Sequence, residues 1–209
     1  SERADEVSRL ANEEAARPFD LKTGPLVRAQ LLTLGPDEHV LLFTMHHVIS
    51  DGWSMGVLFH EIGAIYEALA NQDRSPLPEL PIQYADYAVW QREWLTGETL
   101  ENQIGYWKTR LAGAPPILDL PTDKPRPAIQ QFHGAKHVRQ LPHELTESLK
   151  QLSLDNEVTL YMMLLAAFKV LLWRYTSQDD VVVGSPIANR TRAETEALIG
   201  FFVNTLVMR

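Results

Sequence analysis

Apolar and polar positions follow two periods along the chain, and these periods predict helices and strands in mixed order. Apolar residues three and four positions apart predict helices over about 5–16, 53–69, 83–96, 101–112, 143–155 and 159–175. Short alternating or continuous apolar runs predict strands over 26–34, 39–47, 134–141, 179–187 and 201–208. The first two strands flank a Gly-Pro-Asp turn, so we expect a hairpin. Because strict βαβ alternation is missing, we expect the α/β class, as a layered sandwich with a mixed sheet.

Proline divides the chain into two parts. Five of the 13 prolines lie within residues 115–127, and this segment is expected to be a stiff, extended connector. We therefore expect one lobe over 1–114 and a second over 128–209. The helix over 159–175 is nearly all apolar, so we expect it to be buried on most sides.

Composition and charge exclude several classes of protein. The 209 residues are 45% hydrophobic and 22% charged, which is ordinary for a globular chain. A net charge of −8 makes nucleic acid and anionic membranes improbable partners. The absence of cysteine excludes zinc ribbons, iron–sulfur clusters and thiol nucleophiles.

The two ends of the sequence and its apolar runs indicate a segment of a longer protein, and the absence of cysteine fits the reducing cytoplasm in which we expect it. The apolar run Leu160–Trp173 is interrupted by Lys169 and is too short to span a bilayer. The chain begins with neither an initiator Met nor an apolar signal core, and it stops directly after a predicted strand. We therefore expect a fragment that begins and ends inside a larger chain.

The densest group of reactive side chains lies between Met45 and Ser54, where a predicted strand leads into a predicted helix. Neighbouring side chains of a strand point to opposite faces, so one of His46 and His47 should face a site while the other packs behind it. Gly52 lets the backbone approach a ligand or adopt a positive φ. Free N–H groups at the helix start could stabilise an oxyanion beside a neutral imidazole base.

Other interpretations of these residues stay open. Asp51 or Ser50 could simply cap the helix, and a histidine at a strand end is often structural. A metal site would use one histidine of the pair with Asp51, and His39 or His60 as a third ligand.

Further features have ordinary explanations. The aromatic side chains at helical spacing are expected to pack in a core or between lobes, and they are Tyr84, Tyr87, Trp90, Trp94, Tyr106 and Trp107. Arg190 would ordinarily be a solvated loop charge, and Glu13 with Glu14 a solvated helix face.

Four segments together resemble a known family. HHVISDG, followed by WSMGVL, resembles the HHxxxDG signature of condensation domains of non-ribosomal peptide synthetases. QYADYAVWQ, VVVGSPIANR and IGFFVNTLVMR resemble further motifs of these domains and appear in the family's order. The resemblance implies a chloramphenicol acetyltransferase-like fold built as a two-lobed pseudo-dimer. This chain would hold the later part of the first lobe and the early part of the second.

The resemblance also implies roles for individual residues. His47 is similar to the family's catalytic histidine, and His46 to its supporting neighbour. Asp51 would be structural and paired with Arg190, while Gly52 would lie beside the reacting carbonyl. SDGWSMGVL further resembles the subgroup whose donors end in an L-residue.

The implied reaction forms an amide bond between a donor acyl or peptidyl thioester and the α-amine of an acceptor aminoacyl thioester. Both substrates would be attached to 4′-phosphopantetheine on donor and acceptor carrier proteins, with an adjacent adenylation domain and no cofactor bound by this domain. A non-catalytic carrier-docking module and a coenzyme A-dependent HxxxD acyltransferase are the alternatives.

Overall fold

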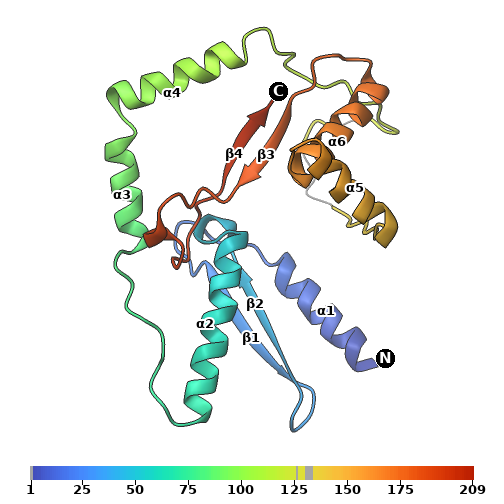
Figure 1. Ribbon diagram of the computed structural model, residues 1–209. Coiled ribbons are helices and arrows are strands. Elements are labelled where there is room, and N and C mark those ends of the chain that lie inside the picture. Colours follow the sequence, from blue (N-terminus) through green and yellow to red (C-terminus); the bar gives the residue numbers. More distant parts are fainter. Residues whose placement is uncertain (1, 126, 130–133) are drawn as a thin grey trace. The chain divides into compact units, whose positions relative to one another are not determined.

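The computed structural model describes residues 2–125, 127–129 and 134–209 (Figure 1). The chain divides into two compact units. One unit contains the chain up to Asn102 together with Pro186–Thr205, and the other contains Gln103–Ser185 with Leu206–Arg209. The first unit holds α1 (Glu2–Ala16), β1 (Val27–Thr33), β2 (His39–Met45), the 3₁₀ helix η1 (His47–Ile49), α2 (Gly52–Ala70), α3 (Tyr84–Trp94) and the 3₁₀ helix η2 (Ala193–Thr195). The second unit holds α5 (His143–Asp155) and α6 (Leu160–Thr176), while α4 (Gly97–Arg110), β3 (Val183–Ile187) and β4 (Asn204–Met208) each run from one unit into the other.

The mixture of helices and strands confirms the predicted α/β class. The four strands of the described residues form two sheets of two strands each, β1 with β2 and β3 with β4. The described residues of the proline-rich segment 115–127 form neither helix nor strand, as its composition predicted. The predicted division into lobes at this segment stays a prediction.

β1 and β2 form the predicted antiparallel hairpin, in which Val27 lies opposite Met45. The carbonyl oxygen of Glu38 closes the turn, because it accepts hydrogen bonds from the N–H groups of Leu34 at 2.8 Å and Gly35 at 3.2 Å. α1 packs against β2. Since β2 ends at Met45, the hairpin places the histidine pair directly after the last residue of the strand.

The core of the first unit is aromatic. Tyr87, Leu198 and Phe202 are buried together, and the partly buried side chains around them are Leu80, Ile82, Tyr84 and Trp90. This packing confirms the role predicted for the first three members of the aromatic series. Trp94 stacks on Trp90 with ring centroids 5.5 Å apart, although nearly half of it is exposed.

Two predictions about the second unit are wrong. Residues 134–141 do not form a strand, because β3 and β4 pair with each other and this segment has no strand to pair its backbone groups. α6 is not buried on most sides, although it forms where the periodicity predicted it. Leu172 is its buried residue, whereas Phe168 and Trp173 are exposed. The reason is that α5 packs against α6, and a single helix covers only one face of its neighbour.

No single helix among the described residues has the length and apolar composition to cross a membrane. α5 and α6 reach those limits only when they are counted together, as a pair bent by 104° at the turn between them.

Candidate active site

The two histidines lie at the junction between β2 and α2 and have different surroundings. His46 precedes η1, and its Nδ1 accepts a hydrogen bond from the Val48 N–H at 3.0 Å. The His46 ring lies edge-to-face with Phe19, with centroids 5.8 Å apart. His46 is therefore held by its own loop, with its ring against Phe19.

His47 is exposed and held at one ring nitrogen. Its Nδ1 lies 2.6 Å from the carbonyl oxygen of Ser50. Because a carbonyl oxygen only accepts, Nδ1 donates this bond, and the neutral ring then has its lone pair on Nε2. The ring of Phe201 stands at 90° to the imidazole, with centroids 5.2 Å apart. The two histidines thus contact different aromatic rings. Neither lies in the strand, since β2 ends at Met45 and η1 begins at His47, so strand alternation does not separate them, and their division into a site-facing and a supporting ring stays a prediction.

Asp51 is the N-cap of α2, which was one of the interpretations left open by the sequence. Its Oδ1 accepts from the Ser54 N–H at 2.9 Å, while its Oδ2 accepts from the Phe202 N–H at 3.0 Å. The side chain is 3% exposed. Both carboxylate oxygens are therefore engaged inside the protein.

Arg190 is buried beside Asp51, so it is not a solvated loop charge. Its side chain is 1% exposed, and its Nη2 lies 3.4 Å from Asp51 Oδ1 and 2.9 Å from Ser54 Oγ. Nη1 donates to the carbonyl oxygens of Thr195 and Leu198. Within the described part of the chain, Nε is buried without a hydrogen-bond partner. The ion pair thus joins α2 to the 190–198 segment, 139 residues further along the chain.

The hydroxyl of Ser54 connects these groups, and the sequence analysis missed its role. Ser54 is completely buried, and its Oγ lies 2.8 Å from Asp51 Oδ1 and 2.9 Å from Arg190 Nη2. The same oxygen lies 2.8 Å from the carbonyl oxygen of Gly200 and 3.0 Å from its nitrogen. The sequence did hint at a contact between Ser54 and Asp51, because Ser54 follows the capping Asp by three residues. A polar residue at that position is ordinarily solvated, however, so its burial was not expected.

The surroundings of Asp51 favour its charged form. Burial disfavours that form, but hydrogen bonds from the N–H groups of Ser54 and Phe202 stabilise it, and the pKa of Asp51 lies below its ordinary value of 3.8. The Ser54 hydroxyl and the Arg190 charge act in the same direction. Asp51 is therefore an ionised hydrogen-bond acceptor at neutral pH and is poorly suited to proton transfer.

Gly52 opens α2 without a positive φ, so that part of the prediction is wrong. Its backbone is helical, and a Cβ placed on it would meet no atom within 4 Å. The space beside the Gly52 backbone is therefore open, and the predicted close approach of a ligand there stays a prediction.

A second ion pair, in which Glu14 is buried, is linked to His46 through the ring of Phe19. Glu14 is buried and pairs with Arg28 and Arg17, so the predicted solvated face holds for Glu13 but not for Glu14. The Arg28 guanidinium lies 3.8 Å above the ring of Phe19, which contacts His46. The prediction failed for Glu14 because one of its two basic partners, Arg28, lies 14 residues away, beyond helical spacing. The other partner, Arg17, lies at helical spacing and is exposed.

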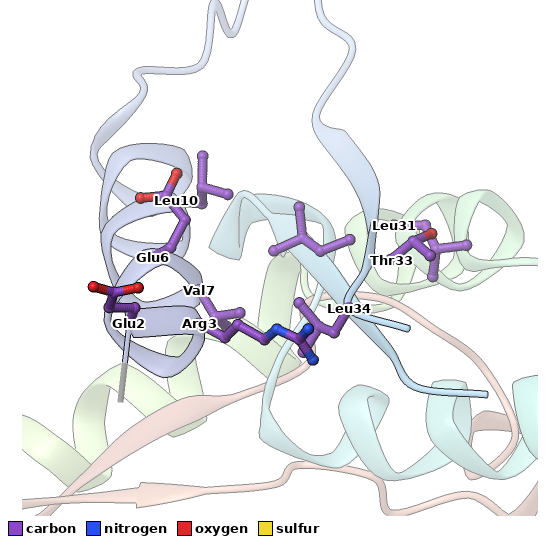
Figure 2. A pocket seen from close by; sticks show the side chains of 9 residues that line it. Glu2, Arg3, Glu6, Val7, Leu10, Leu31, Thr33 and Leu34 are labelled. Carbon is purple, nitrogen blue, oxygen red and sulfur yellow. The ribbon is translucent and has the colours of Figure 1, made fainter. Parts of the chain in front are cut away.

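One pocket lies away from the histidines. Figure 2 shows it between α1 and the β1 segment, with a volume of about 490 Å³ and Val7, Leu10 and Leu31 among its lining residues. None of the five predicted site residues lines it. The described residues also contain no group of three His, Cys, Asp or Glu side chains that could hold a metal ion.

Comparison with known proteins gives one consistent match. The family model described as "Condensation domain" matches residues 1–209. One of the linear gramicidin synthase subunits of Brevibacillus parabrevis is 54% identical over 208 residues, which are 100% of this chain and 3% of that protein. Phosphinothricin tripeptide synthetase PhsC of Streptomyces viridochromogenes is 46% identical, over 100% of this chain and 19% of that protein. The chain thus spans a small fraction of these curated relatives.

Solved structures agree with the sequence match. The X-domain from teicoplanin biosynthesis is similar with a TM-score of 0.88 and 29% identity, over 97% of this chain and 46% of that one. The first condensation domain of the calcium-dependent antibiotic synthetase, in complex with a substrate analogue, gives 0.76 and 26%, over 98% and 47%. A four-domain nonribosomal peptide synthetase bound to AMP and glycine gives 0.85 and 31%, over 98% and 15%.

Proposed function

The chain belongs to the condensation-domain family, which has the chloramphenicol acetyltransferase-like fold, and we propose that it contributes the catalytic histidine for amide-bond formation in a non-ribosomal peptide synthetase. The substrates are a donor acyl or peptidyl thioester and an acceptor aminoacyl thioester. The supporting observation is the geometry of His47, which is exposed and donates from Nδ1 to the Ser50 carbonyl oxygen. This geometry makes Nε2 the nitrogen that can accept a proton.

The reaction needs little activation of its substrates. A thioester is already reactive, and an α-amine with a pKa near 8 is partly neutral at neutral pH. As the amine nitrogen attacks the thioester carbonyl, a C–N bond forms and the C–S bond breaks. His47 Nε2 would take the proton that the amine loses, which then passes to the leaving thiolate. His47 could equally position the amine by a hydrogen bond.

The neighbouring residues have supporting roles in this proposal. His46, against Phe19, would hold the strand end that presents His47. Asp51 and Arg190 would be structural, since both are buried and hydrogen-bonded to the protein. Gly52 would lie beside the reacting carbonyl, in a place where no atom comes within 4 Å of the position that a Cβ would take.

The partners follow from the relatives, which are multimodular synthetases. We infer that both substrates arrive on 4′-phosphopantetheine arms of donor and acceptor carrier proteins, and that an adenylation domain is adjacent. The domain itself would bind no cofactor. A cytoplasmic location stays a prediction from the sequence.

The test uses the complete domain that contains this segment, with loaded donor and acceptor carriers. Intact mass spectrometry of the acceptor carrier measures the acyl transfer. The exchange His47→Ala should lower the transfer rate by about 100-fold or more, because general-base help contributes about 10²–10⁴-fold. His143→Ala, on the exposed first turn of α5, is the matched control and should leave the rate unchanged.

The alternatives predict different results. A docking module would bind both carriers without any transfer by the wild-type domain. A coenzyme A-dependent acyltransferase would accept free acyl-CoA in place of the donor carrier. Wild-type rates in His47→Ala would overturn the assignment of the histidine.

A further inference from the structure

Phe201 and Phe202 are neighbours in the chain whose side chains have opposite surroundings. Phe202 is 3% exposed and packs in the core with Tyr87 and Leu198. Phe201 is 39% exposed, and its ring meets the imidazole of His47 edge-to-face. Phe202 therefore packs in the hydrophobic core, whereas Phe201 packs against the histidine.

The backbone of this segment is fixed at three successive residues. The Gly200 N–H donates to Ser54 Oγ at 3.0 Å, and the Phe202 N–H donates to Asp51 Oδ2 at 3.0 Å. Between them, the Phe201 carbonyl oxygen accepts from the Tyr84 hydroxyl at 2.8 Å. The direction of the Phe201 side chain is thus determined by the buried groups around Asp51.

We propose that Phe201 is a positioning residue for His47 in the condensation reaction, an inference that rests on the function proposed above. The hydrogen bond from Nδ1 to the Ser50 carbonyl oxygen holds the imidazole at a single ring atom. The ring can still tilt about that hydrogen bond. The Phe201 ring, at 90° to the imidazole, restricts that tilt and sets the direction of the Nε2 lone pair. Small displacements of a catalytic group are costly, so this restraint acts on the rate.

This role also links the buried ion pair to the chemistry. Asp51 touches neither ring nitrogen of His47 in any contact among the described residues. However, Asp51 accepts a hydrogen bond from the Phe202 N–H, and Ser54 accepts one from the Gly200 N–H. These two bonds fix the backbone on both sides of Phe201. Asp51 therefore acts on His47 along two routes, one through the Phe201 ring and one through the peptide bond that joins it to the Ser50 carbonyl group.

The first test compares Phe201→Ala with Phe201→Tyr in the complete domain, in a single-turnover assay with loaded carriers. Loss of the ring should lower the maximal rate about three- to tenfold, the factor expected for one edge-to-face aromatic pair, with the KM for the acceptor carrier unchanged. Phe201→Tyr keeps the ring and should keep the wild-type rate. Phe201→Leu replaces the alanine variant if the latter unfolds.

The second test does not need activity. Diethyl pyrocarbonate modifies neutral imidazoles, and peptide mass spectrometry resolves the modification rate at each histidine. In Phe201→Ala the rate at His47 should rise about three- to tenfold, while His46, against Phe19, serves as the internal reference and should not change.

The outcomes separate this proposal from the function on which it rests. A wild-type domain that transfers no acyl group would contradict the proposed function, while the modification rates would still test the contact. An unchanged rate of transfer in Phe201→Ala would overturn the positioning role. A lower transfer rate with unchanged modification of His47 would overturn it too, because Phe201 would then act on the substrate directly.

Discussion

Replacing Ser54 by alanine removes the atom on which the buried groups of the site converge. Ser54 Oγ lies within 3.0 Å of four polar atoms of Asp51, Arg190 and Gly200. A hydroxyl has one hydrogen and two lone pairs. It therefore accepts from Arg190 Nη2 and the Gly200 N–H, and it donates to either Asp51 or the Gly200 carbonyl oxygen.

The expected loss of stability follows from the groups left without a partner. Gly200 is buried, and the exchange leaves its N–H without the bond that Ser54 supplies. Arg190 Nη2 keeps only the longer contact of 3.4 Å with Asp51. Each unsatisfied buried group costs about 1–3 kcal/mol, and more where a charge is involved. Alanine returns up to about 0.5 kcal/mol through its higher helix propensity. We expect the free energy of unfolding to fall by about 2–4 kcal/mol.

Denaturant unfolding of the complete domain measures this change. The matched control is Ser148→Ala in α5, where the hydroxyl bonds to the Glu144 carbonyl oxygen at an exposed position. Its effect should stay within about 0.5 kcal/mol. A loss below about 1 kcal/mol in Ser54→Ala would refute the reasoning, because the hydroxyl would then be replaceable by solvent or by relaxation.

Two further predictions concern the same region. The lowered pKa of Asp51 means that its carboxylate stabilises the fold above the ordinary value of 3.8 and that this contribution is lost as pH falls through the lower folded value. The difference in unfolding free energy between wild type and Asp51→Asn should therefore be constant near neutral pH and shrink in acid; a difference independent of pH would contradict the ionised state. Gly200→Ala should cost about 1–3 kcal/mol in denaturant unfolding, because its Cβ would overlap the ring of Tyr84. Gly105→Ala in α4, with no atom within 4 Å, is the control and should stabilise by up to about 1 kcal/mol; equal effects of the two exchanges would show that Tyr84 moves freely.

Local patterns predicted much of the fold. The six helices and the first hairpin form where the periodicity placed them, within a few residues at each end. Their signals lie inside short windows of sequence, as in the apolar spacing of α2 or the turn before Glu38. The local pattern wrongly predicted a strand over residues 134–141, since a strand forms only where a partner strand can bond to its backbone.

Burial could not be inferred from local patterns. Arg190 and Glu14 are charged residues that sequence alone would leave in solvent, yet each is buried against an opposite charge. α6 shows the converse, because its apolar face remains exposed where the pattern predicted a core. Burial depends on which segments meet, and those segments lie far apart along the chain.

The sequence by itself determined the helices, the first hairpin and the cluster of reactive residues at 46–52, because these depend on neighbours within a few positions. The tertiary structure alone decided which side chains and backbone groups surround those residues. It brought residues 190–202 against the start of α2, enclosed Ser54 and Asp51, and placed the Phe201 ring on His47. The physical reason is that hydrogen bonds and burial between segments some 140 residues apart arise only when the chain folds.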